Sequence, residues 1–222
     1  MVNAQAATPL YQPYFDSLVE WASADPRKPD LLLAKAAYSG LLGEVFDDDR
    51  QFESRMAAFL EFYVCDFVGP NLKCTPAQSR YEEALRTGPA ERAAAFRAFT
   101  ETLHALYEVR RLGAGTVRVR NLISKEDFDV TERRHLAGLT KGDVLEARLI
   151  PFGGNLWFAG AFCCHPPGAT KLLQKQAKRL QKAGDAVNAK AFLWEAAKRS
   201  LKADRYRNIS IERLYDFDAS VP

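Results

Sequence analysis

The sequence predicts an α+β protein in which a small β-module lies between two helical segments. Up to about Leu106, apolar residues recur every three or four positions, as on one face of a helix. Beyond that point they alternate with polar residues, and the helical spacing returns after Pro166-Pro167-Gly168. These changes divide the chain into a helical segment at 1–104, a β-module at 105–166 and basic helices at 167–222.

The composition is that of a globular protein with its own core. The 222 residues are 47% apolar and 27% charged, and a chain of this length folds without disulfides or metal. Its four cysteines indicate reduced thiols and hence a cytoplasmic location. No apolar stretch reaches the length of a membrane-spanning helix, about 20 residues, and the first residues do not resemble a signal peptide. No membrane association is therefore expected.

The helical segment is predicted to hold five helices, each bounded by proline, glycine or a capping residue. The apolar spacing places them at 11–24, 31–42, 52–67, 76–86 and from 90 onward, the last continuing through Leu103.

Polar residues at the start of three of these helices are predicted to act as caps. Asp30 precedes the second helix, and Asp48 and Gln51 have capping-box spacing before the third. Thr75 precedes the fourth, with Pro76 at its first helical position.

The β-module is predicted to contain five short antiparallel strands, forming a small SH3-like barrel or a curled sheet. Turn residues such as Gly113-Ala114-Gly115 and Gly153-Gly154-Asn155 separate the alternating runs. The strands fall near 105–112, 115–123, 127–133, 143–151 and 155–163. The last strand is apolar on both faces, so we expect helices to cover it on both sides.

A helical hairpin is predicted to follow the β-module. Its helices cover 169–183 and 185–203, with Gly184 as the hinge and Asp185 as the second cap, and a short helix is expected within 209–217.

Three runs in the β-module resemble a known family: Val117 to Ile123, Phe128 to Arg133 and Gly142 to Pro151. They are similar to a small β-domain of bacterial proteins of unknown function that also carry a SEC-C motif. The resemblance extends over residues 106–165, about a quarter of the chain. The cysteine-rich zinc hook of the SEC-C motif is absent, so its metal role does not transfer, and the β-domain implies no activity.

Cysteine and histidine supply one candidate metal site. Cys163, Cys164 and His165 offer thiolate and imidazole ligands, which Cys65 and Cys74 would complete if the helices fold against the last strand. Neighbouring cysteines in a strand point to opposite faces, however, and no C-x₂-C pair is present. Buried apolar cysteines are therefore favoured, and no cofactor is expected.

Catalytic signatures are missing from the sequence. No G-x-S-x-G elbow occurs. His104 is predicted to lie on the fifth helix as a packing residue, and His135 in a charged, solvated loop. An acid–base site assembled from scattered carboxylates would leave no motif, so an enzyme stays an alternative.

The carboxy-terminal segment carries the positive charge. Residues 171–207 have a net charge of +8, against −3 for residues 1–170. At 100° per residue, Lys171, Lys175, Lys178 and Lys182 lie within about 60° of one another. The candidate surface for a polyanion comprises these four residues with Lys190, Lys198, Arg199 and Lys202. The alternative is a solvated face whose helices dock on the acidic amino-terminal helices.

Three functions follow. The first is a non-catalytic interaction or regulatory protein of a bacterial cytoplasm, with a protein partner or a second copy of itself. The second is a nucleic-acid-binding protein that uses the basic helices, with Arg118, Arg120 and Arg148 of the β-module as a second surface. The third is an enzyme with an unrecognised acid–base site.

Overall fold

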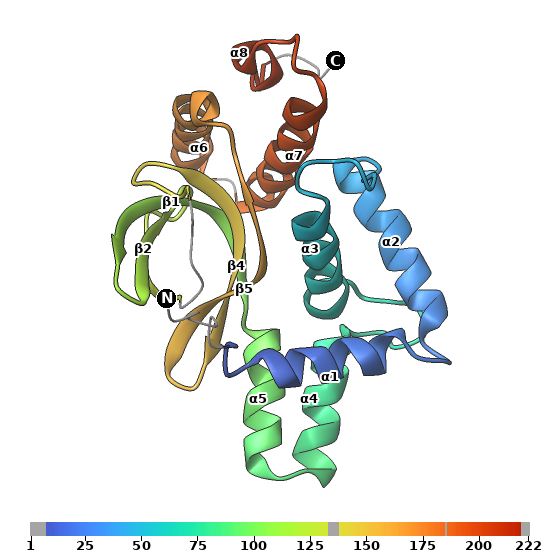
Figure 1. Cartoon of the computed structure of the whole chain (residues 1–222). Helices are drawn as coiled ribbons and strands as arrows, with labels where there is room; N and C mark the ends of the chain where they lie inside the picture. The colour runs from blue at the N-terminus through green and yellow to red at the C-terminus, as the bar shows by residue number, and fades with distance from the viewer. Residues whose placement is uncertain (1–7, 133–137, 185, 219–222) are drawn as a thin grey trace, which may run out of the picture.

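A computed structural model describes residues 8–132, 138–184 and 186–218. In this part of the chain, eight α-helices and five β-strands form an α+β fold, as predicted (Figure 1). The five amino-terminal helices are α1 (Gln12–Ser23), α2 (Lys28–Leu42), α3 (Phe52–Cys65), α4 (Pro76–Thr87) and α5 (Ala90–Thr100). Helices α4 and α5 lie side by side below the sheet in Figure 1, α1 crosses them, and α3 separates the sheet from α2.

Of the three predicted N-caps, one is observed and two are not. Thr75 caps α4 as expected, because its Oγ1 accepts from the backbone N–H of Gln78 at 3.2 Å. Helix α2 instead begins at Lys28, so Asp30 is a buried first-turn residue rather than the N-cap. Helix α3 begins at Phe52 without a side-chain cap, and Asp48 is exposed. In both cases a longer-range contact holds the helix start.

The sheet contains the five predicted strands: β1 (Leu103–Gly113), β2 (Thr116–Asn121), β3 (Asp127–Thr131), β4 (Val144–Phe152) and β5 (Asn155–Cys164). They pair in a closed ring, in the order β1-β2-β3-β5-β4 and back to β1. The prediction of a purely antiparallel sheet is wrong, since β3 and β5 run parallel. Directions cannot alternate all the way round a closed ring of five strands, so at least one pair must be parallel.

Helix α5 ends earlier than predicted. It stops at Thr100, and strand β1 begins at Leu103. His104 therefore lies on a strand rather than on a helix, and it pairs with Arg148 of β4 in the sheet register. The extended conformation is favoured over the helix here because β1 then pairs with one edge of β4, whose other edge is paired with β5.

Strand β5 is covered on both faces, as its apolar sequence requires, but helices cover only one of them. Trp157 and Ala159 face the helical core, where α3 packs on the strand. Phe158 belongs to the cluster enclosed by the sheet itself. The Tyr11 hydroxyl donates to the Phe158 carbonyl at 2.8 Å, which ties α1 to the same strand.

The carboxy-terminal segment comprises the short 3₁₀-helix η1 (Pro167–Ala169), then α6 (Thr170–Ala183), α7 (Ala186–Arg205) and α8 (Ile211–Leu214). Gly184 is left-handed, with φ of 66°, and forms the predicted hinge. Asp185, the predicted cap, lies outside the described residues. Helix α7 packs against α2, where Trp194 meets Tyr38 edge-on at 5.9 Å. None of the described helices is long and apolar enough to span a membrane.

Candidate functional site

Helix α6 exposes the predicted row of lysines. Its buried side carries Leu173 and Ala177, which pack with Leu106 and Val144 of the sheet. The other side exposes Lys171, Lys175, Lys178 and Lys182. Within the described residues, none of these four lysines has an ion-pair or hydrogen-bond partner. This set is called the α6 lysine face below.

Lys125 adds a fifth positive charge beside this face. It lies in the turn after β2, where its Nζ donates to the carbonyl of Leu122. Burial lowers the pKa of Lys125, Glu108 opposes this shift, and the nearby charges of Arg120 and Lys178 add to it. The charge of Lys178 thus acts on Lys125, so positive charge continues from α6 to the turn after β2.

The predicted basic residues on α7 are placed differently. Lys190 is exposed, whereas Lys198 and Lys202 are half-buried. Arg199 is buried, pairs with Glu195 at 2.8 Å and donates to the carbonyl of Leu214 at 2.7 Å. Arg199 therefore holds α8 against α7, and its prediction as a polyanion contact is corrected.

The three sheet arginines predicted as a second basic surface are each paired within the fold. Arg118 pairs with Asp129, and Arg120 pairs with Asp127, each through two hydrogen bonds between neighbouring strands. Arg148 is 2% exposed, and its guanidinium contacts the side chains of Asp66, Glu61 and Thr102. Their positive charge is neutralised within the fold.

The two neighbouring cysteines of the candidate metal site lie on opposite faces of β5. Cys163 is buried and Cys164 exposed, as expected for neighbours in a strand. His165 is buried, with Nδ1 2.9 Å from the Tyr215 hydroxyl. Burial raises the pKa of the Cys65 thiol to about 12. Among the described residues, no group of three or more His, Cys, Asp or Glu side chains is arranged to hold a metal ion.

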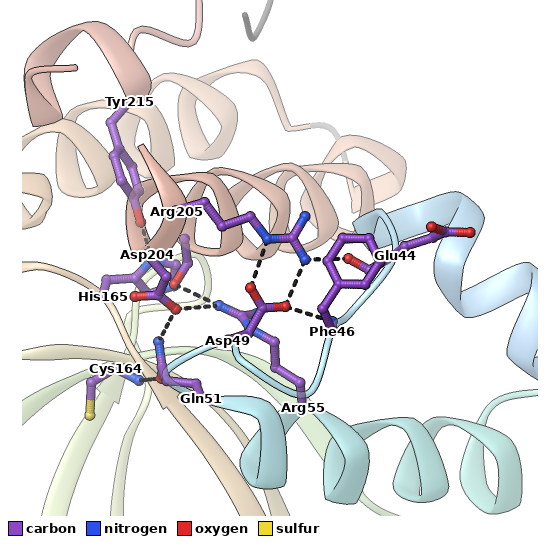
Figure 2. A network of polar contacts seen from close by, with 11 residues as sticks. Glu44, Phe46, Asp49, Gln51, Arg55, Cys164, His165, Asp204, Arg205 and Tyr215 are labelled. Carbon is purple, nitrogen blue, oxygen red and sulfur yellow. Dashed lines mark hydrogen bonds and ion pairs between the residues drawn. The ribbon is translucent and has the colours of Figure 1, made fainter. Parts of the chain in front are cut away.

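A polar network joins α7 to the start of α3 (Figure 2). Arg55, only 1% exposed, donates to Ser200 at 3.2 Å and to Asp204 at 3.4 Å. Gln51 donates to Asp204 at 3.0 Å and accepts from the backbone N–H of Cys164 at 3.0 Å, so it links α7 to β5.

The same network continues to the loop between α2 and α3. Arg205 pairs with Asp49 at 2.6 Å and donates to the Glu44 carbonyl, and its guanidinium lies 4.7 Å from the centre of the Phe46 ring. The predicted docking of basic helices on the acidic amino-terminal segment is thus observed for α7. Helix α6 packs instead on η1, α7 and the sheet.

A second site, not predicted from the sequence, lies between β1 and α7. His104 Nε2 is 3.1 Å from Glu146 Oε1, and the His104 ring meets the Trp194 ring edge-on at 5.5 Å. Burial alone would raise the pKa of Glu146, but the hydrogen bond and charge of His104, with smaller contributions from His165 and Arg55, lower it. Glu146 is therefore an ionised carboxylate inside the fold.

His104 also lines a pocket of about 410 Å³. We call it the His104 pocket. Its polar lining includes Asp66, Thr102, Asn121, Ser124 and Lys190, and its apolar lining includes Leu103, Leu106, Ile123, Phe192 and Leu193.

The sequence contained one signal for this site. Tyr107 and Val109 face the sheet interior, so residues two and four positions earlier or later on the same strand share that face. His104 falls on the opposite face, towards the helices, but assigning it to α5 concealed this alternation. His135, the other histidine considered, lies outside the described residues.

Comparison with known proteins gives a family and no activity. No curated protein and no solved structure matches the chain significantly. The model of a family of unknown function, DUF7986, matches residues 32–197. The match covers more than half of the chain and includes the α6 lysine face, His104, Glu146 and Lys190. The chain therefore belongs to the DUF7986 family.

Proposed function

We propose that the protein binds a polyanion, in the first place a nucleic acid, through the α6 lysine face. The supporting observation is that arginines near this face are paired with carboxylates, whereas its lysines are not. Two arginines near this face are each paired with an aspartate: Arg120, whose charge acts on Lys125, and Arg179 of α6. The four lysines of α6 are exposed with no carboxylate partner in the described chain.

The geometry of α6 suits a phosphate backbone. From Lys171 to Lys182 the helix advances eleven residues, about 16 Å at 1.5 Å per residue. Four lysines that each neutralise one phosphate release bound counterions, so log K against log salt should fall with a slope of about −3.6 for duplex DNA or −2.8 for a single strand. Lysine suits such binding because it acts as a mobile point charge that does not read sequence.

Charge substitution with a matched control tests this proposal. One variant carries Lys171, Lys175, Lys178 and Lys182→Gln. The control carries Lys28, Lys35, Lys73 and Lys141→Gln, which are exposed lysines of α2 and of two loops. Both variants have the same net charge. Fluorescence polarisation with a labelled single-stranded RNA and a DNA duplex, at about 50–200 mM salt, measures affinity and salt slope.

We expect the α6 variant to bind more than about tenfold more weakly and to lose most of the salt slope, and the control to resemble the wild type. Equal losses in the two variants would assign the binding to net charge alone. No binding by the wild-type protein at 50 mM salt would exclude a nucleic-acid function for this face.

A second candidate function is contact with a second copy of the chain through the outer side of α2. Ala34, Tyr38 and Leu42 bury the inner side. The outer side carries a row of exposed apolar or small residues, Pro29, Leu32, Leu33, Ala36 and Gly40, flanked by the exposed Lys28 and Lys35, and Leu32 is 59% exposed. A continuous exposed apolar stripe is typical of an interface.

Sedimentation analysis tests this second candidate. Leu33→Glu on α2 should convert a dimer to a monomer, whereas Leu112→Glu, at a similarly exposed leucine near the end of β1, should not. A wild-type protein that sediments as a monomer at high concentration would contradict it.

Two finer expectations from the sequence accompany these proposals. The closed ring of strand pairs supports an SH3-like barrel as the type of sheet. All four cysteines are free thiols, which supports a reducing, cytoplasmic compartment.

A further inference from the structure

The His104 pocket holds a histidine whose two ring nitrogens have different environments. Nε2 faces the buried Glu146 carboxylate at 3.1 Å. In the described part of the chain, Nδ1 has no hydrogen-bond partner. It is not one of the fully buried unpaired polar atoms, so part of its surface is exposed. Nδ1 is therefore the ring nitrogen that solvent in the pocket can reach.

The carboxylate fixes which nitrogen carries the proton. An ionised carboxylate only accepts hydrogen bonds, so Nε2 must donate to Glu146. In the neutral imidazole this leaves the lone pair on Nδ1. The same carboxylate stabilises the imidazolium that forms when Nδ1 takes a proton, which is how a buried acidic residue supports a general base.

Helix α7 places a cation on the facing wall. Lys190 and Trp194 are four residues apart, so they lie on the same face of the helix. Trp194 contacts the His104 ring, and Lys190 lines the pocket. The other charged group in the lining, Asp66, is bound to Arg148. A base and a cation thus face a volume within the usual range of small-molecule sites, about 300–1,000 Å³.

We propose that the His104 pocket is an acid–base site for a small organic anion with an apolar body. His104 is the general base, Lys190 binds the anionic group, and Phe192 and Leu193 contact the apolar part. Glu146 is a positioning residue, since it acts only through His104. This activity is independent of the polyanion surface on α6.

A model hydrolysis tests the assignment. The probe is the 4-nitrophenyl monoester of succinate, and 4-nitrophenyl acetate is its uncharged counterpart. Water attacks the ester carbonyl while Nδ1 of His104 takes a proton from that water. The carbonyl–oxygen bond breaks, nitrophenolate leaves with the electron pair, and the imidazolium returns the proton to solvent.

We expect the wild-type protein to hydrolyse the succinate ester above the buffer rate, and His104→Gln to abolish this. Lys190→Gln should raise KM for the succinate ester without changing kcat, and leave the acetate ester unaffected. Lys141→Gln, at an exposed lysine that does not line the pocket, removes the same charge elsewhere and should change neither. Hydrolysis that persists in His104→Gln, or no hydrolysis by the wild type, would overturn the proposal.

Glu146→Gln separates positioning from folding. Without the carboxylate the imidazolium is less stabilised, so the rising limb of the pH–rate profile should move to lower pH and kcat should fall about tenfold to a hundredfold. A purely structural role would leave the position of that limb unchanged.

Nitrogen-15 NMR of the wild-type ring reports the tautomer directly, whatever the stability of the variants. A protonated Nδ1 beside a bare Nε2 would overturn the assignment.

Discussion

His165 is a buried histidine enclosed by groups from three elements. Its Nδ1 lies 2.9 Å from the hydroxyl of Tyr215, next to α8, while Arg55 of α3 and Glu146 of β4 act on it electrostatically. Burial lowers the pKa of His165 to about 4; Glu146 opposes this shift and Arg55 adds to it. The ring is therefore neutral in the folded protein near neutral pH.

This neutral ring makes stability depend on pH. The unfolded chain binds a proton at His165 below about pH 6.5, while the folded chain does not until about pH 4. The unfolded state thus binds more protons in this window, and the free energy of unfolding should fall by roughly 1.4 kcal/mol per pH unit from this residue as pH drops through it. Urea titrations of the wild type and His165→Gln at pH 7 and 5 measure the difference. A fall of the same size in both proteins would show that other groups cause it.

At the scale of single elements, the connection after α3 is docked on the first turn of α2. The Asp30 carboxylate accepts from the side chain of Asn71 at 2.9 Å and from the backbone N–H groups of Asn71 and Leu72. Gly69 lies against this carboxylate, because a Cβ there would come within 2.3 Å of it. The Asp30 carboxylate therefore makes a tertiary contact instead of the helix cap that the sequence predicted.

Two glycine substitutions should have opposite effects on stability. Gly69→Ala forces Asp30 away from its hydrogen-bond donors, which should lower the free energy of unfolding by about 1–3 kcal/mol. Gly40→Ala, within α2 and with open space around it, should raise it by about 0.5–1 kcal/mol. Chemical denaturation of both variants measures this. A neutral Gly69→Ala would mean that the Asp30 side chain moves without cost.

Local chemistry explains which elements could be predicted. All five strands lie within two residues of their predicted ends, because glycines such as Gly115 and Gly154 with positive φ fix the turns. The predicted boundary between α5 and β1 was wrong because Leu103 is apolar and fits both the helical and the strand spacing of apolar residues. Arg148 could not be placed either: it alternates like a surface residue, and Asp66, which neutralises it, lies 82 positions away.

The His104 pocket was missed for the same reason. Its lining comes from β1, from β2 and the turn after it, from α7 and from the ends of α3 and α5, and only the tertiary fold brings Lys190 and His104 to one pocket. The lysine row of α6, by contrast, needed only the helix period and was placed correctly. The resemblance to SEC-C-associated domains stays a prediction.

At the scale of the whole molecule, one core joins the three segments of the chain. Its members include Phe62 of α3, Trp157 of β5, and Trp194 and Leu201 of α7. Neither the amino-terminal helices nor the sheet encloses its apolar surface without α7. The segments should therefore unfold together rather than one after another.

The three tryptophans test this directly, since each lies in a different segment. Trp21 is on α1, Trp157 on β5 and Trp194 on α7. Variants that keep one tryptophan and carry Phe at the other two should show a change of fluorescence at a shared urea midpoint within each protein, coincident with loss of helix by circular dichroism. A fluorescence transition of Trp157 that precedes helix loss would indicate that the sheet unfolds separately.

The parallel pair that closes the ring has a consequence for motion. Strands β3 and β5 run parallel where Val130 pairs with Leu156 and Thr131 with Trp157, while the other neighbours in the ring are antiparallel. Parallel pairs are slightly less stable per residue than antiparallel pairs. The amides at this seam should therefore exchange with solvent through local opening before those of the β4–β5 hairpin, which α3 covers.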